Sequence, residues 1–170
     1  MVPHVDKLRK SSSRGAQYSL HLEPEGNRPQ PATEEDLCFA IKCILEALEQ
    51  LHSEPDPLLH RDIRWPNIVQ KRDNSAEWLL IDWEDASTFP TLPPSRSFSR
   101  ETHSPRVFEA GHGTEVDLWA VGTLITTWEG GQPSESMMQL AEEMINGAIK
   151  TATDALLQFN EYMEPKIVLS

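Results

Sequence analysis

The sequence has few cysteines, few basic residues and no long apolar run, and each shortage excludes a class of protein. The 27 aspartates and glutamates outnumber the 15 lysines and arginines, so the formal net charge is −12. Nucleic acids and anionic membranes select basic surfaces, so neither is expected as the main partner. No apolar run approaches the roughly 18 residues that a membrane-spanning helix needs, and the first residues contain no apolar signal-peptide segment. The composition leaves the oligomeric state open.

The two cysteines indicate the compartment rather than the chemistry. Cys38 and Cys43 do not have the spacing of a zinc site, and both fall inside a predicted helix. We expect two reduced thiols on or near a core face. Unpaired cysteines of this kind favour an intracellular protein, either cytoplasmic or nuclear.

The length of 170 residues predicts one domain or a part of one. Residues 1–17 are polar, with a short basic run and three consecutive serines, and we interpret them as a disordered tail. Residues 18–170 carry regular patterns of apolar residues. We therefore expect a partial domain over this range.

Apolar spacing and turn residues predict the order of the elements. A helix is expected from Thr33, which starts a capping box with Asp36, to about residue 52. A strongly apolar stretch at 117–129 predicts a buried helix, and 136–159 predicts one or two amphipathic helices. Short strands are expected at residues 18–22, 58–59, 68–70 and 78–81, with a hairpin turn at 71–75. Residues 87–104 are dense in Ser, Thr and Pro and predict a long loop.

Three motifs carry the chemistry. The sequence His-Arg-Asp-Ile-Arg-Trp-Pro-Asn occupies residues 60–67, and Leu-Leu-Ile-Asp-Trp-Glu occupies residues 79–84. They place Asp62, Asn67 five residues later, and Asp82 beyond a short hairpin, which is the constellation of a phosphoryl-transfer site. The third motif, Asp-Leu-Trp-Ala-Val-Gly, opens the apolar helix at Asp117.

In this order and spacing the motifs resemble those of the protein kinase superfamily, over about residues 18–129. The residues within these motifs look most like those of the fungal-type protein-kinase-like families. The resemblance implies a mainly α fold with a small β-hairpin, which is a kinase-like C-lobe (α+β) without its N-lobe. It also implies that Asp117 is structural, because in the family this Asp holds the backbone of the His-Arg pair.

The resemblance assigns catalytic and metal-binding roles to four residues. Asp62 would accept the proton of the substrate hydroxyl, and Arg64 occupies a position where many kinases carry a cation facing the transferred phosphate. Asn67 would hold magnesium, and Asp82 would bridge magnesium to the phosphates of ATP. We therefore expect Asp62, Asn67 and Asp82 to converge on one metal-phosphate cluster.

A further segment resembles the family's adenine-binding hinge. It runs over residues 22–26 and contains Glu23 and Glu25, which are our candidates for ATP contacts. With Asp82, these residues complete the predicted cofactor site.

The sequence departs from the kinase pattern in three ways. Residues 1–17 contain no Gly-x-Gly-x-x-Gly loop and are too short and polar to supply the N-lobe with its strand lysine. Glu84 stands where the family's Asp-Phe-Gly motif has glycine, and Arg106 stands where Ala-Pro-Glu ends in glutamate. A lysine and a glycine-rich cover normally orient the phosphates. We therefore expect at most weak ATP binding and no robust phosphotransfer from residues 1–170 alone.

Three functions are compatible with these patterns. The first is ATP-dependent phosphoryl transfer to Ser or Thr of protein substrates. The second is a pseudokinase-type module that docks a protein partner without catalysis. The third is a small-molecule kinase of the aminoglycoside or choline type, a class that shares the Ile-Asp-Trp-Glu motif.

Overall fold

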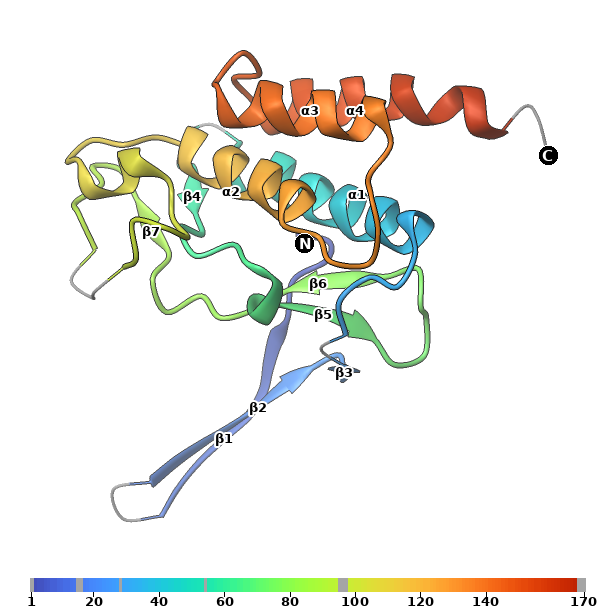
Figure 1. Ribbon diagram of the computed structural model, residues 1–170. Helices are drawn as coiled ribbons and strands as arrows, with labels where there is room; N and C mark the ends of the chain where they lie inside the picture. The colour runs from blue at the N-terminus through green and yellow to red at the C-terminus, as the bar shows by residue number, and fades with distance from the viewer. Residues whose placement is uncertain (1, 15–16, 28, 54, 95–97, 168–170) are drawn as a thin grey trace.

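The computed structural model describes residues 2–14, 17–27, 29–53, 55–94 and 98–167. It is mostly helical with small antiparallel sheets, as predicted (Figure 1). The elements are β1 (Lys7–Arg14), β2 (Gln17–Glu23), β3 (Gly26–Asn27), α1 (Glu34–Leu51), β4 (Leu58–Leu59), the 3₁₀ turn η1 (Trp65–Asn67), β5 (Ile68–Lys71), β6 (Trp78–Leu80), β7 (Ser87–Thr88), the 3₁₀ turn η2 (Pro105–Phe108), α2 (Glu115–Thr126), α3 (Glu135–Ile145) and α4 (Ala152–Ile167). The described strands pair as β1–β2, β3–β5–β6 and β4–β7.

Helix α1 is the centre of the core. Its start is fixed by the predicted capping box, in which the Asp36 N–H donates to Thr33 Oγ1 at 3.1 Å and the Thr33 N–H donates to Asp36 Oδ2 at 3.2 Å. The helix packs on β6, α2 and α4, so its buried positions extend around much of its circumference. They are Leu37, Cys38, Ala40, Ile41, Cys43, Ile44, Leu45, Ala47, Leu48 and Leu51.

Helix α2 is buried between α1 and α3, and Figure 1 shows α3 and α4 as a second layer above α1 and α2. Most positions of α2 are buried, including its first-turn carboxylate Asp117. Gly122 allows α3 to approach closely, because a Cβ at that position would lie 2.7 Å from the carbonyl oxygen of Ala141. The packed helices form the rigid base beneath the candidate site.

The N-terminal segment differs from the disordered tail that we expected. Strand β1 pairs antiparallel with β2, and the ribbon projects away from the helices in Figure 1. Just before it, the carbonyl oxygen of His4 accepts a 2.8 Å hydrogen bond from the Leu80 N–H, and Val5 forms a parallel bridge with Leu80. Polar composition suggested disorder, but here backbone pairing with β2 and with the free edge of β6 sets the structure. The boundary between residues 17 and 18 stays a prediction.

Both cysteines are buried in α1 as thiols and form no disulfide. Burial raises the pKa of Cys43 to about 11, so this thiol is protonated at neutral pH and has little nucleophilic character. No helix in the described part of the chain is long and apolar enough to cross a membrane.

Candidate active site

The hairpin β5–β6 positions two of the predicted metal-binding residues. Ile68 pairs with Leu80, so Asn67 ends the turn before β5 while Asp82 lies just beyond β6. The Ile81 N–H donates to the Asn67 carbonyl oxygen at 3.0 Å, which closes this end of the hairpin. The predicted hairpin with Asn67 and Asp82 at its ends is thus confirmed. Asp82 is exposed and has a φ of 69°, a conformation that L-residues rarely adopt.

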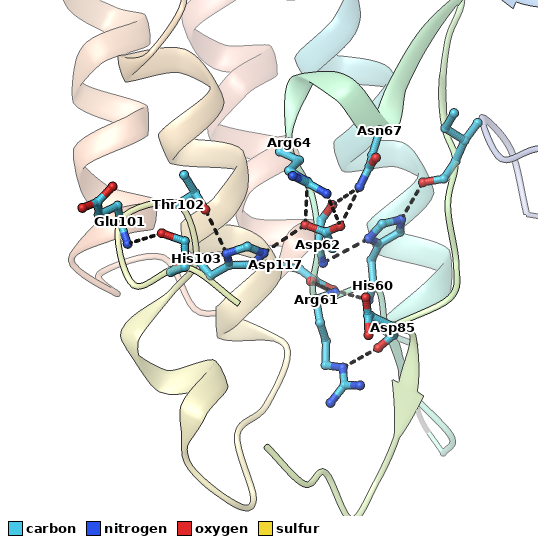
Figure 2. Close-up of polar contacts among 12 residues, drawn as sticks. His60, Arg61, Asp62, Arg64, Asn67, Asp85, Glu101, Thr102, His103 and Asp117 are labelled. Carbon is cyan, nitrogen blue, oxygen red and sulfur yellow. Dashed lines mark hydrogen bonds and ion pairs between the residues drawn. The ribbon is translucent and has the colours of Figure 1, made fainter. Parts of the chain in front are cut away.

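The carboxylate of Asp62 is the meeting point of three side chains (Figure 2). Asp62 Oδ1 is 2.8 Å from Arg64 Nε and 3.0 Å from His103 Nε2. Asp62 Oδ2 accepts from Asn67 Nδ2 at 2.8 Å and from an Arg64 guanidinium nitrogen at 3.1 Å. The structure therefore brings together three predicted site residues and adds His103.

These contacts also set the charge of Asp62. Burial alone would raise its pKa, but the hydrogen bonds from His103 and Asn67 and the positive charge of Arg64 outweigh burial and lower it below the ordinary value. The carboxylate is therefore ionised at neutral pH. An ionised carboxylate can accept a hydroxyl proton, which is what the predicted role requires.

Asp117, in the first turn of α2, holds the backbone of the His-Arg-Asp loop (residues 60–67). Its side chain is fully buried and accepts hydrogen bonds from the His60 N–H at 2.8 Å and the Arg61 N–H at 2.7 Å. His52 Nε2 lies 2.9 Å from the same carboxylate. Arg61 has a φ of 70°, so Asp117 stabilises a conformation that is otherwise unfavourable. The predicted structural role of Asp117 is confirmed.

His60 packs within the loop and has no free ring nitrogen for chemistry. Burial lowers the pKa of His60 below its ordinary value, so the ring is neutral. Its Nε2 lies 3.0 Å from the Ile81 carbonyl oxygen, and its Nδ1 accepts from the Asp62 N–H at 3.3 Å. The edge of the ring contacts Trp83, whose indole N–H donates to Asp6 at 2.7 Å. His60 thus links the loop to the end of the hairpin.

The segment predicted to be a hinge lies beside the hairpin. Gly26 pairs with Lys71 of β5, and a Cβ at Gly26 would lie 2.8 Å from the Gln70 carbonyl oxygen, which favours glycine there. The exposed Glu25 carboxylate pairs with Arg72 at 2.7 Å. The backbone of this segment is paired as well, because the Arg72 N–H donates to the Glu25 carbonyl oxygen at 3.1 Å. The assignments of Glu23 and Glu25 stay predictions.

Two residues of the site escaped sequence analysis, and one departure from the motif is accommodated locally. The sequence pattern places His52 at the end of a helix and His103 in a polar loop, and neither pattern indicates a site residue. The adjacency of His103 to the Ser-Pro-Arg motif at residues 104–106 was the available signal for it. Arg106 pairs with Glu109 at 3.3 Å and lies 3.8 Å from Glu115, so its reversed charge is balanced within the segment.

Comparison with known proteins defines the class. A family model described as the protein kinase domain matches residues 14–167. The chain belongs to the protein kinase domain family, which agrees with the arrangement around Asp62 and Asp117.

Of three relatives compared with this chain, one is named an effector protein and two are named kinases. The chain is 40% identical over 114 residues to Crinkler effector protein 8 of Phytophthora infestans, covering 65% of this chain and 18% of that protein. It is 27% identical over 145 residues to Protein kinase 2 of Dictyostelium discoideum, covering 82% and 29%. It is 27% identical over 166 residues to Mitogen-activated protein kinase kinase kinase 3 of Arabidopsis thaliana, covering 88% and 24%. The chain thus spans less than a third of the length of each of these relatives, and the fungal-type assignment stays a prediction.

Proposed function

We propose that this chain carries the catalytic loop of an ATP-dependent protein kinase that phosphorylates Ser or Thr of protein substrates. The observation that carries the proposal is the buried, ionised carboxylate of Asp62, which Arg64 and Asn67 contact. Asp117 holds the backbone of the loop that carries it. A positioned base beside a cation is what phosphoryl transfer asks of a protein.

In this proposal each residue has a separate task. Asp62 accepts the proton of the substrate hydroxyl and orients its oxygen. Arg64, whose side chain is 49% exposed, swings from Asp62 to the phosphate. Asn67 and Asp82 offer the amide and carboxylate oxygens that magnesium prefers. When bound, magnesium supplies positive charge that stabilises the phosphate oxygens in the transition state.

The oxygen donors fit a shared metal site rather than a closed protein cage. No cluster of three or more His, Cys, Asp or Glu side chains with metal-binding geometry occurs among the residues that the structure describes. Magnesium usually keeps few protein ligands and takes the rest from phosphates and water. A site made by Asn67, Asp82 and the phosphates of ATP agrees with this coordination preference. The hinge at residues 22–26 would then lie beside the adenine. The two buried thiols, which form no disulfide, support an intracellular location, in the cytoplasm or nucleus.

One observation favours the binding-module alternative. Each oxygen of Asp62 already contacts two donors, so a substrate hydroxyl must displace one of them. A hollow of about 580 Å³ lined by Arg106, Trp119 and Lys150, among others, offers a separate surface for a protein partner. If the donors never leave Asp62, docking at such a surface would be the remaining function.

A transfer assay with three kinds of acceptor tests the proposal. Purified residues 1–170 are incubated with radiolabelled Mg-ATP and a generic Ser/Thr protein, an aminoglycoside or choline. We expect label on protein Ser or Thr, at a turnover well below the roughly 1–100 s⁻¹ of protein kinases, because the phosphates lack a glycine-rich cover in this polypeptide. Label on a small molecule would replace the proposal with the third function. No label on any acceptor would favour the binding module.

A further inference from the structure

His103 is a buried histidine within the long loop that follows the hairpin. It lies at the end of the docking turn, which we define as residues 98–104, and only 8% of its surface is exposed. Its ring stacks on Phe98 with the centroids 4.1 Å apart and the planes inclined by 19°. The turn is closed by its own backbone, because the His103 N–H donates to the Ser99 carbonyl oxygen at 3.1 Å. The histidine is therefore a built part of this turn.

Both nitrogens of the His103 ring face hydrogen-bond acceptors. Nε2 lies 3.0 Å from Asp62 Oδ1, and Nδ1 lies 3.0 Å from the Ser99 carbonyl oxygen and 3.0 Å from Thr102 Oγ1 (Figure 2). A carboxylate can only accept, so Nε2 donates to Asp62. Nδ1 can then accept from the Thr102 hydroxyl. The geometry thus suits a ring that donates from Nε2 to Asp62.

Among the described residues, the other charged groups near this contact lie on the His-Arg-Asp loop and on the docking turn. Arg64 contacts the same carboxylate from the His-Arg-Asp loop. Within the docking turn, the Arg100 guanidinium lies over the Phe108 ring, 4.5 Å from its centroid, and the backbone N–H of Glu101 donates to the Ser99 hydroxyl. Asp62 is therefore the carboxylate that His103 contacts directly.

The donors of Asp62 differ in how easily they can leave. The Arg64 side chain is 49% exposed and can move into solvent or toward a phosphate without disturbing the core. The His103 side chain is 9% exposed and is held by Phe98 and by the docking turn, so it can leave only if that turn moves. A substrate hydroxyl would therefore replace Arg64, while His103 stays on Oδ1.

We propose that His103 is a positioning residue that holds the carboxylate of Asp62 from the docking turn. The contact fixes the orientation of the carboxylate and makes the geometry of the base depend on the conformation of the turn. The kinetic consequence rests on the proposed kinase function, whereas the contact itself does not.

NMR at a constant pH of about 7 tests the contact in the full chain. With the side-chain carboxyl carbon of Asp62 labelled, we compare the wild type with His103→Phe, which keeps the stacked ring but has no N–H, and with His103→Gln, which keeps a donor. His4→Gln is the matched control, because His4 lies 2.8 Å from the Glu46 carboxylate at another place. We expect the chemical shift of the Asp62 carboxyl carbon to change in His103→Phe, to change less in His103→Gln, and to stay the same in His4→Gln. An unchanged chemical shift in a folded His103→Phe variant would overturn the proposal.

A second measurement covers the case in which His103→Phe does not fold. In the wild type and in Asp62→Asn, the Nε2 signal of the His103 ring is compared by NMR at the same pH. We expect this signal to shift when the carboxylate is replaced, since Nε2 lies 3.0 Å from Asp62 Oδ1. A signal that does not move would overturn the proposal.

Kinetics then separate this inference from the proposed function. In the transfer assay we expect His103→Phe to lower kcat at least tenfold with KM for ATP unchanged, and His103→Gln to recover part of the loss. If the Asp62 signal changes in His103→Phe but the wild type transfers no phosphate, the contact is supported and the kinase function is overturned. Transfer that survives in His103→Phe with both NMR signals unmoved would support the kinase function and overturn the role of His103.

Discussion

Replacing Asp117 with alanine is expected to lower the free energy of unfolding by about 3 kcal/mol or more. The side chain is fully buried, and the variant would leave the N–H groups of His60 and Arg61 and the ring of His52 without their acceptor. Arg61 would also lose the contact that stabilises its positive φ. Urea denaturation followed by tryptophan fluorescence measures the change. Asp73→Ala, at a side chain that is 79% exposed, is the matched control and should be near neutral.

The pH dependence of this loss has a defined sign. Burial alone would raise the pKa of Asp117, but the hydrogen bond and charge of His52, with the loop N–H groups, lower it below the ordinary value of 3.8. A lowered pKa contributes stability that is present above the unfolded value and is lost as pH falls through the folded value. Wild type and Asp117→Ala should therefore differ most at neutral pH and converge in acid. A loss below about 0.5 kcal/mol at pH 7 would show that Asp117 is solvated.

Replacing Asp62 with asparagine is expected to lower phosphotransfer by at least about a hundredfold, the usual scale of general base catalysis. The amide keeps the size of the side chain and can still accept hydrogen bonds, but it cannot take the hydroxyl proton. The radiolabel assay measures the loss, with Asp73→Asn as a control that makes the same charge change at a surface turn. Circular dichroism should show both variants folded. Equal activity in Asp62→Asn and Asp73→Asn would mean that Asp62 is not the base.

Local signals predicted the helices and the hairpin well, because neighbouring residues determine them. The capping box at Thr33 and Asp36 starts α1 as expected, and Ile68–Lys71 and Trp78–Leu80 form the predicted strands. The polar composition of residues 7–14 does not indicate a strand, although β1 pairs with β2, which follows it directly in the chain. Composition describes side chains and does not reveal which backbone edge a polar segment will find.

The site was predicted to the extent that its motif is contiguous. Asp62, Arg64 and Asn67 lie within six residues, and the structure joins them around one carboxylate. His103 is 41 residues from Asp62, and its place beside the Ser-Pro-Arg motif does not indicate Asp62 as its partner. The docking turn brings them into contact only after folding, so such a partner is visible in the structure and not in the motif.

In the proposed function, Asn67 and Asp82 hold a divalent metal together with the phosphates of ATP, beside Asp62. Mn²⁺ takes the same oxygen ligands as Mg²⁺ and broadens the NMR signals of nearby nuclei, so it detects even weak binding. In the presence of ATP we expect the amide signals of Asn67 and Asp82 and their neighbours to broaden first, and Asp82→Asn to remove this effect while Asp73→Asn does not. Broadening spread over the acidic surface, unchanged by ATP and by Asp82→Asn, would contradict the account.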